Sequence, residues 1–219
     1  MAPTVLACVV PGLKRRLAHW EETGRRLTAS PDIQAAGPFV WEVFDHGLSA
    51  FRRKRLDPVA RNLEAWIADQ WDAHDRPERI ILVGHTAGAL LARKAWLNCV
   101  DPGQGADFTG GDWGKHVSRF VLFAGVSRGV DMDRFLWRRI LTKIAELIPG
   151  QFTFEEGMRG SALITNLRIS WMRHLARFDP AEVPAMIQML GTKDDYITRE
   201  DNLDLEQFPH SAPINIPDA

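Results

Sequence analysis

The stretch from Ile80 to Arg93 constrains the fold of this chain more than any other part of its sequence. It begins with four apolar residues, which predict a buried strand, and it ends in small and apolar residues with helical spacing. Between these parts lie Gly84 and Gly88, four positions apart, which predict a tight turn. A strand that passes directly into a helix is a unit from which parallel α/β sheets are built.

Alternating strand and helix patterns extend over the rest of the chain. They predict strands at residues 4–10, 39–44, 79–83, 117–124, 183–190 and 212–216. They predict helices at residues 14–27, 87–97, 131–148, 161–178 and 201–207, and a further helix that has Asp57 as its N-cap. Residues 30–38 are predicted to form a loop. This alternation predicts a mostly parallel, doubly wound α/β sheet. Residues 127–178 hold more helix than a simple connection between the strands at 117–124 and 183–190 needs, so they predict a helical cap. This cap packs on the main domain, covers a substrate pocket, or does both.

Length, charge and cysteine content set further limits. The chain has 219 residues and a formal net charge of −1, so we expect one domain (residues 1–219) and no nucleic-acid partner. The N-terminus lacks the basic start of a signal peptide and no apolar run could span a bilayer, so we expect a cytoplasmic location. Cys8 and Cys99 lack metal-site spacing and predict buried, reduced thiols. The basic residues 52–55 predict a solvated loop, with a phosphate or lipid headgroup contact as the alternative.

Three segments together carry a resemblance to a known family. Gly84-His85-Thr86-Ala87-Gly88 follows the Gly-x-Ser-x-Gly pattern of a nucleophile elbow, with Thr86 where serine is expected. Residues 9–13, Val-Val-Pro-Gly-Leu, follow the family's strand and His-Gly turn, with Pro11 in place of the histidine. Residues 187–197 follow the strand ending in Gly-x-x-Asp that carries the family's acid. Over nearly its whole length the chain therefore resembles the α/β-hydrolases of the esterase and lipase group.

The resemblance implies roles for particular residues. Thr86 takes the place of the nucleophile, and the backbone N–H groups of Leu13 and Ala87 would bind the oxyanion. Asp194 takes the place of the acid, and Asp195 is the alternative. Two aspartates after a strand are also common in a capped turn, but the chain order of nucleophile and then acid favours the catalytic role. The resemblance implies neither a metal nor an organic cofactor.

The sequence does not supply an obvious base for a catalytic triad. In the family the histidine follows the last strand, whereas here only Pro217-Asp218-Ala219 follow residues 212–216. The weaker candidates are His46 after the second strand, His85 in the turn, His174 in the cap and His210 before the last strand. Either the chain is the N-terminal part of a longer protein, with further domains after Ala219, or the base has been lost.

Threonine at the nucleophile position also bears on activity. A β-branched side chain fits poorly in the strained backbone of an elbow, and a displaced nucleophile reacts slowly. We expect hydrolysis of carboxylic esters with an apolar acyl group, weak or absent in this chain, with a small ester or lipid-like molecule as partner. The alternative is a catalytically silent domain that binds a ligand or a partner chain. Thioester and amide hydrolysis stay open, because the elbow serves all acyl transfers.

Overall fold

A six-stranded parallel sheet forms the centre of the molecule. The computed structural model describes residues 4–13, 16–48, 55–101, 112–129, 156–177, 179, 182–191 and 211–216. The strands are β1 (Val5–Val10), β2 (Phe39–Val43), β3 (Arg79–His85), β4 (Val117–Phe123), β5 (Ala185–Gly191) and β6 (Ser211–Ile216). They lie in the order β2-β1-β3-β4-β5-β6 and every neighbouring pair is parallel, which confirms the predicted sheet type.

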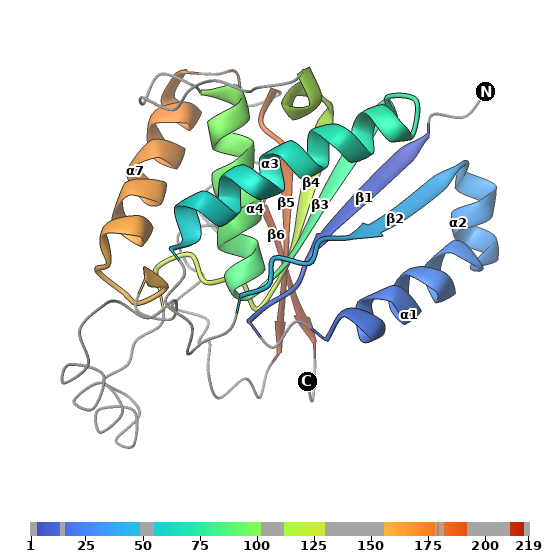
Figure 1. Cartoon of the computed structure of the whole chain (residues 1–219), viewed down its shortest axis with the longest axis horizontal. Helices are drawn as coiled ribbons and strands as arrows, with labels where there is room; N and C mark the ends of the chain where they lie inside the picture. Colours follow the sequence, from blue (N-terminus) through green and yellow to red (C-terminus); the bar gives the residue numbers. More distant parts are fainter. Residues whose placement is uncertain are drawn as a thin grey trace.

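Helices lie on both faces of this sheet (Figure 1). They are α1 (Leu17–Thr28), α2 (Pro31–Ala36), α3 (Leu56–Ala73), α4 (Ala87–Val100) and α7 (Ala162–Arg177), with a 3-10 helix, η1 (Asp112–His116). The larger layer consists of α3, α4 and α7, whereas α1 packs on β2 from the other side. Within the described part of the chain, no helix is long and apolar enough to cross a membrane. The predicted helices at residues 131–148 and 201–207 lie outside the described residues.

The two faces of the sheet differ in how well they are covered. On the α3 and α4 side, strand residues such as Leu82, Phe120 and Leu122 are fully buried, because apolar helix residues at a spacing of four pack against them. On the α1 side, the alternate residues Val121, Ile187 and Met189 are only half-buried, and Ile214 of β6 is 44% exposed. The main hydrophobic core therefore lies beneath α3 and α4.

The strand order creates a switch point between β1 and β3. From β1 the chain passes to β2 on one side, and then returns to place β3 on the other side of β1. In open α/β sheets, ligands bind in the crevice at the carboxyl ends of the strands, where the winding direction reverses. The loops that follow Val10 and His85 meet at this point.

An aromatic cluster holds α7 against α4 and β4. The Trp96 ring lies 5.2 Å from the Trp171 ring and 5.7 Å from the Phe120 ring, centroid to centroid. Trp171 is 2% exposed, because the rings of Trp96 and Phe120 lie against it. Helix α7, which belongs to the predicted cap, thus lies in the same helical layer as α4, while residues 130–155 lie outside the described residues.

Two local predictions were wrong, the first for a local reason and the second because of a distant partner. Residues 31–36 form helix α2 instead of a loop, with Pro31 in its first turn. Helix α3 begins at Leu56, so Asp57 is not its N-cap. The Leu56 N–H donates instead to the Glu156 carboxylate, and Asp57 pairs with Lys94 at 3.6 Å.

Truncating the centre of the aromatic cluster should destabilise the protein strongly. For Trp96→Ala we expect the free energy of unfolding to fall by about 3–5 kcal/mol, because a large cavity opens between α4, α7 and β4. Urea unfolding followed by circular dichroism measures this change. Met172→Ala is the matched control on α7, since Met172 is 55% exposed and its truncation should change stability by less than about 0.5 kcal/mol.

Candidate functional site

The turn between β3 and α4 has a strained backbone at Thr86. This residue has φ 48° and ψ −113°, a conformation that β-branched residues rarely adopt. Its N–H donates to the carbonyl of Phe123 on β4 at 3.0 Å, and Ala87 begins α4 directly after it. Strain of this kind persists only where the surroundings fix it, and it is concentrated at functional sites.

Glycines at both ends of the turn allow the helix to approach the sheet closely. A Cβ atom on Gly88 would lie 1.9 Å from the Val10 carbonyl oxygen, and one on Gly84 would lie 2.6 Å from the Ala89 Cα. Both contacts are with backbone, which side-chain movement cannot relieve. The predicted tight turn between Gly84 and Gly88 is therefore confirmed, and its physical cause is the direct contact of backbones.

The turn after β1 lies against Thr86. A Cβ atom on Gly12 would lie 2.2 Å from the Thr86 Oγ1 and 2.7 Å from the His85 Nδ1, so a larger residue would displace both side chains. Leu13 follows and is half-buried. The amino end of α4, where Ala87 lies, carries the positive end of the helix dipole. The structure thus brings together Thr86 and the two turns that contain Leu13 and Ala87.

His46 lies at the same edge of the sheet, in the loop after β2. It is 6% exposed, and its Nε2 lies 3.0 Å from the Pro11 carbonyl oxygen. Its Nδ1 accepts a hydrogen bond from the Leu48 N–H at 2.9 Å. The sequence identified His46 only as a weaker candidate for the base, and its signal was the Asp45-His46-Gly47 turn that follows a strand.

Two other histidines serve in packing. The His85 ring lies 6.0 Å from the Trp20 ring of α1. His174, 3% exposed, lies 4.8 Å from the Trp96 ring in the contact of α7 with α4. Burial lowers the pKa of His174, and the positive charge of Arg177 lowers it further, while Asp101 raises it.

The acid predicted at Asp194, and its alternative Asp195, lie outside the described residues, as does His210. The described strand β5 ends at Gly191, at the same edge of the parallel sheet as β3. The carboxyl end of β5 therefore lies at the same edge of the sheet as Thr86.

Both cysteines are buried thiols outside any disulfide, as predicted. Burial raises the pKa of the Cys99 thiol to about 11 and raises that of Cys8 further, so both stay protonated and unreactive at neutral pH. Within the described residues, no three His, Cys, Asp or Glu side chains are grouped as a metal site.

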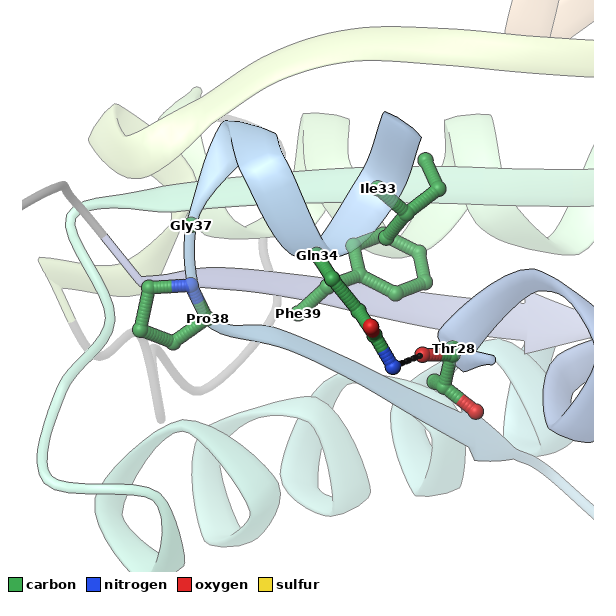
Figure 2. A pocket seen from close by; sticks show the side chains of 6 residues that line it. All are labelled: Thr28, Ile33, Gln34, Gly37, Pro38 and Phe39. Atoms are coloured by element: carbon green, nitrogen blue, oxygen red, sulfur yellow. Dashed lines mark hydrogen bonds between the residues drawn. The ribbon is translucent and has the colours of Figure 1, made fainter. Parts of the chain in front are cut away.

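A cavity of about 350 Å³ lies at the amino end of β2, whereas His46 follows the carboxyl end of this strand (Figure 2). It is lined by Thr28, Ile33, Gln34, Gly37, Pro38 and Phe39. The Gln34 side chain donates to the Thr28 carbonyl at 3.2 Å, so one of its two amide N–H groups is already used within the protein. Thr86 lies at the carboxyl edge of the parallel sheet, and the cavity lies at the amino end of β2, so the two sites are separate.

Comparison with known proteins supports the fold. No family model matches the chain, and no curated protein sequence does. The putative hydrolase from Agrobacterium vitis S4 is similar over 100% of this chain and 83% of its own, with a TM-score of 0.63 and 16% identity. The lipase BlEst2 from Bacillus licheniformis matches 99% of this chain and 83% of its own, with a TM-score of 0.58 and 10% identity. The chain has the α/β-hydrolase fold.

Another structure with this fold is longer. The phospholipase PlaB from Legionella pneumophila matches 88% of this chain with a TM-score of 0.54 and 18% identity. The chain spans about 40% of the length of PlaB. At these identities, the likeness extends to the arrangement of the α/β-hydrolase fold and not to the chemistry of its site.

Relieving the strain at Thr86 should stabilise the domain. For Thr86→Gly we expect the free energy of unfolding to rise by about 1 kcal/mol, because glycine adopts a positive φ without a steric penalty. Urea unfolding measures the change. Thr165→Gly, at an exposed position within α7, is the control and should lower stability by a few tenths of a kcal/mol. A loss at both positions would contradict strain at Thr86.

His174 should make stability depend on pH. Its pKa is lowered in the folded protein, so the unfolded chain binds more protons as the pH falls through about 6.5. This contribution to stability is therefore fully present above that pH and is lost below it. Urea unfolding at pH 7.5, 6.5 and 5.5 should show a smaller loss on acidification for His174→Phe than for the wild type; equal losses would contradict this assignment.

Proposed function

We propose that this chain is built for the hydrolysis of carboxylic esters, with Thr86 at the nucleophile position. The strained turn at Thr86, with its hydroxyl against Gly12 and the amino end of α4 directly after it, carries this proposal. The hydrolase elbow places its nucleophile on just such a strained turn from strand to helix. Lipases and a phospholipase among the structures with this fold support an apolar acyl group in the substrate.

The reaction follows the scheme of acyl transfer. The Thr86 oxygen attacks the ester carbonyl while a histidine base accepts its proton, and the carbonyl becomes an oxyanion. The N–H groups of Leu13 and Ala87 donate hydrogen bonds to that oxyanion. The intermediate collapses to an acyl-threonine as the protonated base gives its proton to the departing alcohol. Water, activated by the same base, then releases the acid and restores Thr86.

We propose that Asp194 orients this base and that the base lies in a segment after Ala219, in a longer protein. Among the described histidines, His46 is bonded to Pro11 and Leu48, and His85 and His174 pack against tryptophans. Since β6 is parallel to the other strands, its carboxyl end lies at the same edge of the sheet as Thr86. The half-exposed apolar face near Ile214 offers such a segment a surface for packing.

A catalytically silent domain is the second candidate. Threonine in the strained turn and the engagement of the described histidines favour it. In that case the same crevice at the carboxyl ends of β1 and β3 would bind a ligand without converting it. Activity after repair of the site would distinguish the two functions.

An ester-hydrolysis assay on four versions of the chain tests the proposal. The versions are the chain as given, Thr86→Ser, a form extended beyond Ala219, and both changes together. We expect activity only in the extended forms, with the serine version faster by about 10-fold or more because the extra methyl displaces the attacking oxygen. p-Nitrophenyl acetate and p-nitrophenyl octanoate serve as substrates.

Two outcomes would count against parts of this proposal. Activity of Thr86→Ser without the extension would place the base within the given chain. The absence of activity in all four versions would reject the enzymatic function and favour the silent domain. In the active version, Asp194→Asn should reduce kcat by about 10²-fold or more, and the Asp195→Asn variant tests the alternative acid.

A further inference from the structure

The His46 ring connects the loop after β2 to the turn after β1. It is buried, and its two ring nitrogens form hydrogen bonds of ordinary length with Pro11, at 3.0 Å, and Leu48, at 2.9 Å. The loop that carries it is itself well fixed. The Gly47 N–H donates to the Asp45 carboxylate at 3.0 Å, and Leu48 is 1% exposed. The ring is therefore held firmly on the β2 side.

The partners of the ring determine its tautomer. The Leu48 N–H is a donor, so the His46 Nδ1 must accept and carries no proton. The Pro11 carbonyl is an acceptor, so the Nε2 must carry the proton and donate. His46 is thus a neutral imidazole whose two nitrogens are both engaged. A second proton on Nδ1 would break the bond with Leu48, which makes this ring unsuited to the role of a catalytic base.

The backbone of the β1 turn is held from two sides. On one side, Gly88 lies so close that a Cβ atom there would come within 2.6 Å of the Pro11 carbonyl oxygen. The His46 Nε2 binds that same oxygen at 3.0 Å. A fixed carbonyl fixes its whole planar peptide unit, which joins Pro11 to Gly12. Gly12 in turn lies against the Thr86 hydroxyl, and Leu13 is the next residue.

We propose that His46 is a positioning residue that aligns the Leu13 N–H for the oxyanion by holding the Pro11 carbonyl. This role rests on the proposed function of the site. It gives His46 no contact with the substrate and no part in proton transfer. Loss of its donor would let the Pro11–Gly12 peptide turn, which moves one oxyanion donor while the rest of the crevice stays intact.

Kinetics of two His46 variants, made in whichever of the four versions is active, test this role. For His46→Leu we expect kcat to fall by about 10-fold or more with KM changed by less than about threefold, because a donor to the transition state is displaced. For His46→Gln we expect kcat within about threefold of the parent, since the glutamine amide N–H can replace the imidazole Nε2–H. The matched control is His74→Leu, which removes a half-buried histidine paired with Glu42 and should leave kcat unchanged.

The nitrogen-15 NMR signals of the His46 ring provide a second test, which does not require activity. They should show the proton on Nε2 in the wild-type chain. A proton on Nδ1, an equal loss of kcat in both His46 variants, or no loss in His46→Leu would overturn the positioning role while the hydrolase function stands. If no version hydrolyses an ester, the hydrolase function fails, and this role fails with it.

Discussion

The contact between the first turn of α4 and the carboxyl end of β1 is the constraint on which the site depends. Gly88 lies directly against the carbonyl oxygens of Val10 and Pro11, with no side chain between the two backbones. Protein interiors are packed too densely to absorb an added atom at such a point. This contact keeps the Thr86 turn sharp and places the β1 turn beside it. The positive φ of Thr86 is the local cost of the arrangement.

Around this contact, the molecule provides a rigid frame at the switch point of the sheet. The amino end of α4 offers positive potential, and His46 holds the neighbouring turn through a hydrogen bond. The aromatic cluster of Trp96, Trp171 and Phe120 fixes the far side of α4. A fixed frame of this kind is what the proposed oxyanion site requires.

Most of the fold could be predicted from the sequence because its signals are local. Apolar runs marked the strands, and the glycine pair with its flanking patterns marked the turn at Thr86. The start of α3 was misplaced because its first N–H is bonded to Glu156, which is 100 residues distant. The candidate site shows the same division. Gly12 and Thr86 belong to local motifs and were identified from the sequence, whereas the hydrogen bond between His46 and Pro11 was not.

The sequence by itself determined the parallel α/β architecture and the position of the strained turn, since periodicity and glycine spacing depend on neighbours along the chain. Only the tertiary structure decided the strand order, the placement of α7 beside α4, and the tautomer of His46. Each of these depends on contacts between residues far apart in the chain. Such contacts have no fixed spacing, so no pattern in the sequence reveals them.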